Sequence, residues 1–188
     1  MSIKIEKTNQ RKKYTEIRNL EVNKFGEQIY LEVLNTLENL ITTNNYKGFI
    51  GIYWPIKTEV DLRVLRSSGK FSLALPFCKT RKEMDFHPWL DDSFQKDLHG
   101  IPYPSGEEPL QPEQIDLLLV PALAIDLEGY RLGYGGGYFD RLRSKDKWRN
   151  IKAIVVLPEA CISKKNLPRN YWDIPFDGWI TEKGFHEL

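Results

Sequence analysis

Apolar residues recur at helical spacing through the first 45 residues of the chain. The first two dozen residues are highly charged, with Ile17 and Leu20 three positions apart. Farther along, apolar side chains return every three or four positions in two stripes, which consist of Val22, Phe25, Ile29 and Val33, and of Tyr30, Leu34, Leu37 and Ile41. Because such steps place side chains on one face of a helix, the pattern predicts a charged N-terminal helix and a second, amphipathic helix that ends at Asn44 and Asn45.

Short apolar runs predict a set of buried strands after these helices. The runs are rich in aromatic and β-branched residues and cover 48–54, 70–76, 115–121, 151–158 and 178–182. Between the first two, Thr58 and the acidic residues after it predict the start of a helix that Gly69 ends. A strand, a helix and a strand in succession favour parallel pairing of the two strands.

The proline-rich segment 77–114 predicts short strands and loops laid over one edge of the sheet. With the strands and helices above, it completes an α/β pattern without an internal repeat. We therefore expect one domain over residues 1–188, with three layers and a mostly parallel central sheet flanked by helices.

The segment from Asp126 to Arg141 carries the strongest chemical signal. It follows the predicted strand 115–121, and glycine occupies four of the five positions in 133–137. Missing side chains let backbone N–H groups approach an anion, and ligands of open α/β sheets bind beyond the carboxyl ends of strands. Arg131 and Arg141 flank the glycines and are suited to contact phosphate oxygens. The block lacks the spacing of the common nucleotide motifs, so a tight strand-to-helix turn stays open as an alternative.

Acidic residues near this block are candidate magnesium ligands. Asp140 lies just inside the helix predicted after the glycines, and Asp173 and Asp177 follow near the C-terminus. Mg²⁺ usually takes one or two protein carboxylates beside phosphate groups. A first-turn acid also compensates a helix dipole, and the two later acids also fit a surface loop, so both interpretations of each residue stay open.

Composition narrows the range of functions. The 188 residues include 27 basic and 26 acidic side chains, and this balance argues against a protein that coats nucleic acid. No run approaches the ~18–20 apolar residues of a membrane span, and we expect no secretory signal. Cys78 and Cys161 are far apart in sequence. We therefore expect a reduced, cytoplasmic, monomeric protein without a zinc site or nucleic-acid or membrane partners.

One long motif resembles a known family. The sequence PALAIDLEGYRLGYGGGYFDR, from Pro121 to Arg141, resembles the signature of 5-formyltetrahydrofolate cyclo-ligases, also called methenyltetrahydrofolate synthetases. Four weaker blocks occur in the family's order. They are Lys7-x-x-x-Arg11, YWPIKTEVD at 53–61, Met84-Asp85-Phe86, and Asp173 through Thr181-Glu182. Together the blocks span nearly the whole chain.

The resemblance implies an activity and a fold. ATP and 5-formyltetrahydrofolate would give 5,10-methenyltetrahydrofolate, ADP and phosphate, with Mg²⁺ as cofactor. The fold would be the α/β type shared with sugar-phosphate isomerase-like domains. Phosphoryl transfer needs mainly positioning and charge neutralisation, so a catalytic nucleophile is not required.

The resemblance also implies roles for individual residues. ATP would contact Lys7, Arg11, Arg131, Leu132, Gly133, Tyr134, Gly135, Gly136, Gly137, Tyr138 and Phe139. The folate would contact Ile52, Glu59, Tyr134, Gly135, Gly136, Gly137 and Tyr138, while Asp140 and Asp173 would hold the metal. Arg131 and Tyr138 would be catalytic. A carboxylate such as Glu59 accepts two pterin N–H donors at once, although helix-dipole compensation is an alternative role for it.

The chain departs from the family pattern at three places. Ile125 replaces a Phe, the segment VVLPEA at 155–160 differs from the family, and Trp172 stands where a His commonly precedes Asp173. The segment 155–160 leaves one wall of the pocket open to question. Two other functions fit the residues alone: a sugar-phosphate isomerase or transferase that does not use ATP, and a non-catalytic nucleotide-binding module.

Overall fold

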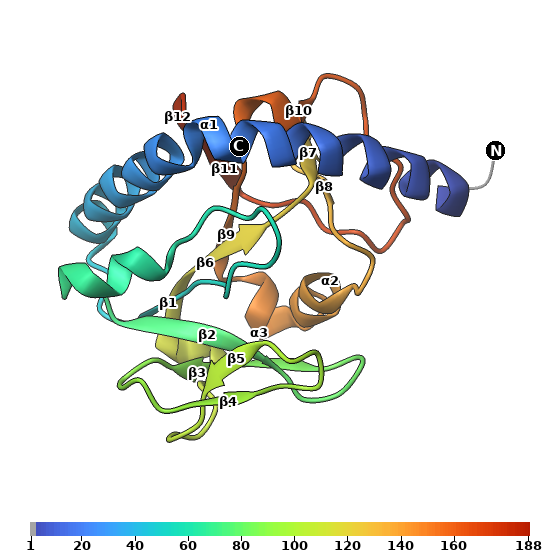
Figure 1. Ribbon diagram of the computed structural model, residues 1–188. Coiled ribbons are helices and arrows are strands. Elements are labelled where there is room, and N and C mark those ends of the chain that lie inside the picture. The colour runs from blue at the N-terminus through green and yellow to red at the C-terminus, as the bar shows by residue number, and fades with distance from the viewer. Residues whose placement is uncertain (1–2) are drawn as a thin grey trace.

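The computed structural model describes residues 3–188, and its first element is a single long helix, α1 (Ile3–Asn44). The prediction of two helices was wrong. The charged stretch around Leu20 contains no glycine or proline, so nothing in it ends the helix. Its polar residues only shift the side of the helix on which the apolar residues lie. Asn45 has a φ of 54° and follows the last helical residue, which confirms the predicted end. Figure 1 shows α1 crossing the width of the molecule, with its N-terminal end projecting beyond the strands.

A seven-stranded sheet with the order β12-β11-β9-β6-β1-β2-β3 forms the centre of the fold. Its strands are β1 (Phe49–Gly51), β2 (Leu73–Cys78), β3 (Met84–Pro88), β6 (Ile115–Pro121), β9 (Lys152–Val156), β11 (Gly178–Thr181) and β12 (Gly184–Glu187). The five inner strands pair in parallel, and the two edge strands β3 and β12 are antiparallel to their neighbours. All five predicted strands are confirmed, and β12 is an addition that the sequence pattern did not predict.

Two small sheets flank the central one. The first pairs β7 (Ala124–Asp126) with β8 (Arg131–Leu132) and with β10 (Ile162–Ser163). The second is the hairpin of β4 (Phe94–Lys96) and β5 (Pro102–Pro104), which contacts β2 and β3. The predicted short strands and loops over one edge of the sheet are thereby confirmed.

Alternating side chains of the central strands divide the core into two halves, one on each face of the sheet. Leu118 and Val120 pack with the helices α2 (Tyr138–Arg143) and α3 (Asp146–Arg149). Leu117 and Leu119 pack on the opposite face with the second half of α1 and with the 3₁₀-helix η1 (Arg63–Ser68). Strand side chains alternate between faces, so this segregation confirms the predicted three-layer α/β domain.

The helix expected from Thr58 to Ser68 forms only in part. Residues 55–62 are irregular, and η1 begins at Arg63 and ends at Gly69, whose φ is 64°. The expected capping residues have other partners: the Thr58 hydroxyl donates to Asn19, and the Asp61 carboxylate accepts the Arg63 N–H at 3.0 Å. The segment after β1 is therefore free to wrap around a cavity. Short 3₁₀-helices in the remainder of the chain are η2 (Pro112–Gln114) and η3 (Glu159–Cys161).

Within residues 3–188, none of the helices combines the length and the apolar character that crossing a lipid bilayer requires.

Candidate active site

A cavity of about 940 Å³ opens at the carboxyl ends of β1, β2 and β6. Four parts of the chain form its wall: the N-terminal turns of α1, the loop after β1, the region from β2 to β5, and the segment from β8 to Asp173. The lining residues include Lys7, Arg11, Tyr53, Glu59, Cys78, His99, Arg131, Leu132, Gly133, Tyr134, Gly135, Gly136, Gly137, Tyr138, Phe139, Asp140 and Asp173. Nearly every residue predicted from the sequence thus reaches one cavity.

The glycine block supplies bare backbone to this wall. Gly135 and Gly137 have φ values of 105° and 67°, which side-chain-bearing residues rarely adopt. Among the hydrogen bonds within residues 3–188, none is donated by a backbone N–H from 133 to 137. These N–H groups therefore remain available to an anion. The tight-turn and anion-site interpretations are compatible here, because the turn is what exposes the amides.

Helix α1 docks its first turns against the glycine block. The Arg11 Nε donates to the Gly133 carbonyl at 2.9 Å, and Lys7 Nζ forms an ion pair with Asp173 Oδ2 at 2.7 Å. The Lys7 and Asp173 side chains keep 17 and 20% of their surface exposed. Lys7 has three donors, so pairing with one carboxylate leaves it able to contact a phosphate.

The Arg131 side chain is largely buried, unlike an arginine that binds phosphate on the protein surface. Its side chain is 7% exposed, donates to the Pro121 carbonyl at 3.1 Å, and lies 3.3 Å from Asp140 Oδ1. Its guanidinium also stacks on the Phe139 and Phe176 rings, with 5.2 Å between the guanidinium carbon and each ring centroid. The predicted catalytic arginine is therefore held rigidly at the cavity wall.

Glu59 adds a buried carboxylate to the wall of the cavity, from the loop after β1. Its Oε2 accepts the Ile56 N–H at 2.8 Å, while its Oε1 is buried and has no hydrogen-bond partner within residues 3–188. Burial raises the pKa of the Glu59 carboxyl to about 6, against the opposing effect of the Ile56 amide and Arg18. Buried polar atoms are rarely left unpaired, so this oxygen stands out in a residue that lines the cavity.

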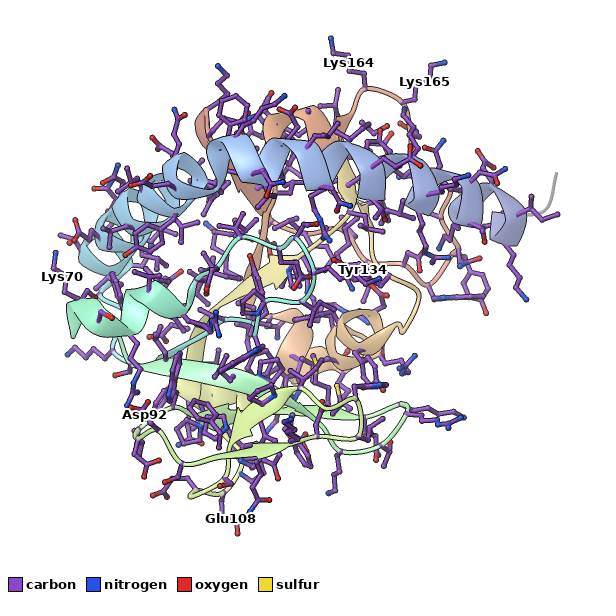
Figure 2. All side chains as sticks on the ribbon, in the orientation of Figure 1. Lys70, Asp92, Glu108, Tyr134, Lys164 and Lys165 are labelled. Carbon is purple, nitrogen blue, oxygen red and sulfur yellow. The ribbon has the colours of Figure 1, made fainter. Side chains whose placement is uncertain are left out.

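Tyr134 links this carboxylate to the glycine block. Its hydroxyl accepts a hydrogen bond from the buried guanidinium of Arg18. Burial raises the Tyr134 pKa well above 10, and the charge of Glu59 raises it further. Figure 2 shows Tyr134 beneath α1 in the middle of the molecule, while Lys70, Lys164 and Lys165 project outward. Arg18 was missed from the sequence. The signal that could have found it is the spacing of Lys7, Arg11, Tyr14 and Arg18, which continues one helical stripe.

Tyr138 and Arg141 connect the glycine block to the region between β2 and β5. The Tyr138 hydroxyl lies 2.6 Å from His99 Nε2 and donates to the Thr80 carbonyl at 3.3 Å. Arg141 was expected to meet phosphate oxygens. It donates to the backbone carbonyls of Lys82 and Gly136, each at 2.7 Å, and also lines the cavity, so its contact with phosphate stays a prediction.

Three predicted features lie away from the cavity or alter its rim. Ile52 is fully buried in the core on the α1 side of the sheet and does not line the cavity, whereas its neighbour Tyr53 does. The altered segment 155–160 is also absent from the lining residues, so it does not shape this wall. Trp172 is 56% exposed and stands at the cavity next to Asp173.

The two predicted metal ligands fit a phosphate-bound cation. No group of three or more His, Cys, Asp or Glu side chains within residues 3–188 is arranged to hold a metal by itself. Asp140 and Asp173 each use one oxygen on protein donors and keep the other oxygen without a protein hydrogen bond in the described part of the chain. This donor set suits Mg²⁺, which binds through one or two carboxylates, water and substrate phosphates.

Comparisons with known proteins agree on one family. The model of the 5-formyltetrahydrofolate cyclo-ligase family matches residues 6–182. The 5-formyltetrahydrofolate cyclo-ligase of Haemophilus influenzae is 30% identical over 86% of this chain and 91% of its own length. That of Mycoplasma genitalium is 26% identical and covers 88% of both chains.

Solved structures support the same assignment. The NMR structure of Aquifex aeolicus 5,10-methenyltetrahydrofolate synthetase has a TM-score of 0.75 and 30% identity, and covers 97% of this chain and 92% of its own. A 5,10-methenyltetrahydrofolate synthetase from Mycoplasma pneumoniae, at 22% identity and a TM-score of 0.67, shares the fold over 94% of this chain and 98% of its own. The chain is therefore an enzyme of the 5-formyltetrahydrofolate cyclo-ligase family.

Proposed function

We propose that this enzyme converts 5-formyltetrahydrofolate into 5,10-methenyltetrahydrofolate with consumption of ATP in the presence of Mg²⁺. The observation that carries the proposal is that the wall of one cavity combines two chemically different sets of groups. One set (the glycine end) consists of the cations Lys7, Arg11 and Arg131 and of the glycine block, whose backbone N–H groups donate no hydrogen bond within residues 3–188; the other (the Glu59 end) is the carboxylate of Glu59. The first set suits an anionic phosphoryl donor, and the second suits a ring with N–H donors.

The glycine end is proposed to hold the ATP phosphates. Backbone amides, Lys7 and Arg11 would bind the negative oxygens, while Leu132 and Phe139 close the wall behind them. Arg131 points into the same region and would neutralise charge that develops on the transferred phosphoryl group. Its stacking on two phenyl rings fixes its direction, so little reorganisation is needed during the reaction.

Asp140 and Asp173 are proposed to hold the magnesium ion through their available oxygens. Bound Mg²⁺ would neutralise phosphate charge and orient the terminal phosphoryl group. The ion pairs with Arg131 and Lys7 keep both carboxylates directed at the region where the phosphates would lie.

The Glu59 end is proposed to hold the pterin ring. An ionised Glu59 would accept N–H donors of the ring, while the rings of Tyr53 and Tyr134 offer flat apolar contact. This arrangement would aim the 5-formyl oxygen back toward the glycine block, near Tyr138. Ile52 is enclosed in the core, so its proposed effect on the substrate would be indirect, through its neighbour Tyr53.

The chemistry follows from the weak electrophilicity of the formyl group. The formyl oxygen attacks the γ-phosphorus of ATP, ADP leaves, and the formyl carbon becomes iminium-like. N10 then forms a bond to that carbon and loses its proton, and the C–O bond breaks to release phosphate. The protein's task is to position the two substrates and exclude water, which agrees with a site built from backbone, cations and aromatic rings.

A direct assay tests the proposal. The purified enzyme is mixed with 5-formyltetrahydrofolate, ATP and Mg²⁺, and the near-ultraviolet absorbance of the conjugated methenyl product and the release of phosphate are followed together. We expect equal amounts of both products and no methenyl product when ATP or Mg²⁺ is omitted. Product formation without ATP would refute the proposal, and sugar-phosphate turnover would favour an isomerase instead.

A further inference from the structure

We propose that Arg18 is a positioning residue for folate recognition, which keeps Glu59 as a carboxylate and holds the Tyr134 ring against the substrate. The inference rests on the proposed function, because it names how the Glu59 end of the cavity is organised. Arg18 itself does not line the cavity, so it would act only through the two side chains that do.

Arg18 is a buried charge with a specific set of partners. Its side chain is 2% exposed, and its guanidinium donates to the Ala122 carbonyl at 3.2 Å and to the Thr58 hydroxyl at 3.4 Å. A third hydrogen bond goes to the Tyr134 hydroxyl, and the guanidinium carbon lies 5.0 Å from the Tyr134 ring centroid. Because a planar guanidinium fixes several acceptors at once, Arg18 ties the glycine block to the loop after β1.

Arg18 also faces the unpaired oxygen of Glu59. Its Nη1 lies 3.9 Å from Glu59 Oε1, which is too long for a hydrogen bond but close enough for strong attraction at a buried site. Neither this oxygen nor the Arg18 Nε has a hydrogen-bond partner within residues 3–188. The pair is therefore attracted without being mutually satisfied, next to a cavity that Glu59 lines and Arg18 does not.

The other groups around Glu59 do not replace this charge. Tyr53 from the loop after β1 and Tyr134 from the glycine block are phenols whose pKa values are raised by burial, and the Tyr134 hydroxyl lowers the Glu59 pKa less than Arg18 does. Arg131 acts on Glu59 more weakly than Arg18 does, and its own partner is Asp140. Arg18 is thus the nearest cation to a carboxyl whose pKa burial has already raised to about 6. Loss of Arg18 would move that pKa upward, into the range where the group is protonated at neutral pH.

The test compares Arg18→Met and Arg18→Lys with the wild-type enzyme. The readouts are the pH dependence of kcat/KM for 5-formyltetrahydrofolate and the KM for ATP. In Arg18→Met we expect the acidic midpoint of the folate profile to rise by about 1 unit or more, with a loss of about 10-fold in kcat/KM at neutral pH. The KM for ATP should stay within about twofold, because Lys7 and Arg11 are untouched.

Arg18→Lys separates charge from geometry. Lysine keeps the positive charge but lacks the planar fork, so the pH midpoint should stay near that of the wild type while the KM for folate rises. If Arg18→Met does not fold, the lysine variant still decides the matter: a folate KM within about twofold of the wild type would overturn the proposal. An unchanged pH midpoint in a folded Arg18→Met enzyme would overturn it as well.

Two controls exclude a purely structural role. Arg143 is equally buried, donates to the Pro175 carbonyl and lies outside the cavity wall, so Arg143→Met should lower stability without moving the folate pH midpoint. In a Glu59→Gln background, Arg18→Met should no longer shift the profile, because the titrating group is gone. If the wild-type enzyme forms no methenyl product at all, the proposed function fails, whereas an unchanged pH midpoint in an active Arg18→Met enzyme overturns only the role of Arg18.

Discussion

At the scale of single residues, Glu59 shows how the same burial serves recognition and costs stability. The residue is 8% exposed, and its pKa of about 6 stands above the ordinary value of 4.5 because burial disfavours the charged form. One oxygen accepts the Ile56 amide N–H, and the other is buried without a hydrogen-bond partner within residues 3–188. An unpaired buried acceptor destabilises the empty enzyme and becomes useful only when a ligand brings a donor.

The first prediction concerns the pH dependence of stability. Between pH 4.5 and about 6 the unfolded chain releases the Glu59 proton while the folded protein retains it, so the free energy of unfolding should fall as pH rises through this window. The raised pKa corresponds to about 2 kcal/mol, which is fully lost above the window. Urea unfolding at pH 4.5 and 7.5 checks this. In Glu59→Gln the fall in unfolding free energy between pH 4.5 and 7.5 should be about 2 kcal/mol smaller than in the wild type. An equal fall in both proteins would contradict the prediction.

Asp140 leads to a second prediction, about metal dependence. Replacing it with asparagine keeps the shape of the side chain but removes the charge that would bind Mg²⁺ beside the phosphates. We expect Asp140→Asn to need at least about 10-fold more Mg²⁺ for half-maximal activity. Titration of activity with Mg²⁺ at fixed ATP measures the shift. Asp146→Asn, at the exposed start of α3, is the matched control and should have the Mg²⁺ requirement of the wild type. An unchanged Mg²⁺ requirement in Asp140→Asn would exclude Asp140 as a ligand.

At the scale of elements, α1 and the glycine block form one unit. Lys7, Arg11 and Arg18 project from the same helical stripe, and each contacts the region of the glycine block or its neighbours. A continuous helix fixes the spacing of these three cations, so their positions relative to the cavity are set together. If the helix ended near Leu20, as the charge pattern predicted, a loop would set the orientation of this stripe relative to the second half of the helix.

The third prediction tests the backbone geometry of the block. Gly137 has a φ of 67°, and a Cβ placed there would lie 2.6 Å from Arg141 Nη1. Gly137→Ala should therefore cost about 1–2 kcal/mol in unfolding free energy and reduce turnover, because strain moves the exposed amides. Urea unfolding and steady-state kinetics measure both effects. Gly106→Ala is the control: no atom lies within 4 Å of its added Cβ, and it should be neutral, whereas a neutral Gly137→Ala would show that the turn tolerates a side chain.

At the scale of the whole molecule, the cavity joins parts of the chain that lie far apart in sequence. The Lys7–Asp173 ion pair spans 166 residues, the Arg11–Gly133 hydrogen bond 122, and the Arg18–Tyr134 hydrogen bond 116. A ligand that bridges these walls should stabilise the fold as a unit, since it binds only when all of them are assembled.

The fourth prediction follows from this linkage. A non-hydrolysable ATP analogue with Mg²⁺, at about 100 times its Kd, should stabilise the folded protein by about 2.7 kcal/mol and raise Tm by about 5–10 °C. Thermal unfolding with and without the analogue checks the shift. Lys7→Met should reduce it, because one phosphate-binding cation is lost. The same Tm with and without the analogue would show that the nucleotide does not bind in the assembled cavity.

Local sequence patterns predicted much of the fold correctly. The strand at 115–121 has the bounds that its apolar run indicates, because it is a central parallel strand whose residues 117–120 are buried, with Asp116 as its one polar residue. Thr58 and Glu59 misled the prediction of a helix start, because their side chains bond to Asn19 and Ile56 instead of to helix amides. Local capping signals do not reveal when a tertiary partner takes the capping side chain.

The candidate site, like the fold, was predictable from the sequence only in part. The glycine block and its acids were visible in sequence because they are contiguous and restrict the backbone locally. Arg18 was not visible, because an arginine on a charged helix resembles any surface residue until packing buries it. Ile52 was assigned to the pocket as part of a strand leading to it, and strand alternation turned its side chain into the core.

The sequence by itself determined the α/β architecture, the succession of buried strands and the bare backbone between residues 133 and 137, since each depends on residues close together in the chain. Only the tertiary structure decided which charges are buried, which carboxylate oxygen has no hydrogen-bond partner within residues 3–188, and which backbone carbonyls the arginines bind. The physical reason is that burial and electrostatic pairing depend on contacts between segments more than 100 residues apart, as between Arg18 and Tyr134, which no local pattern encodes.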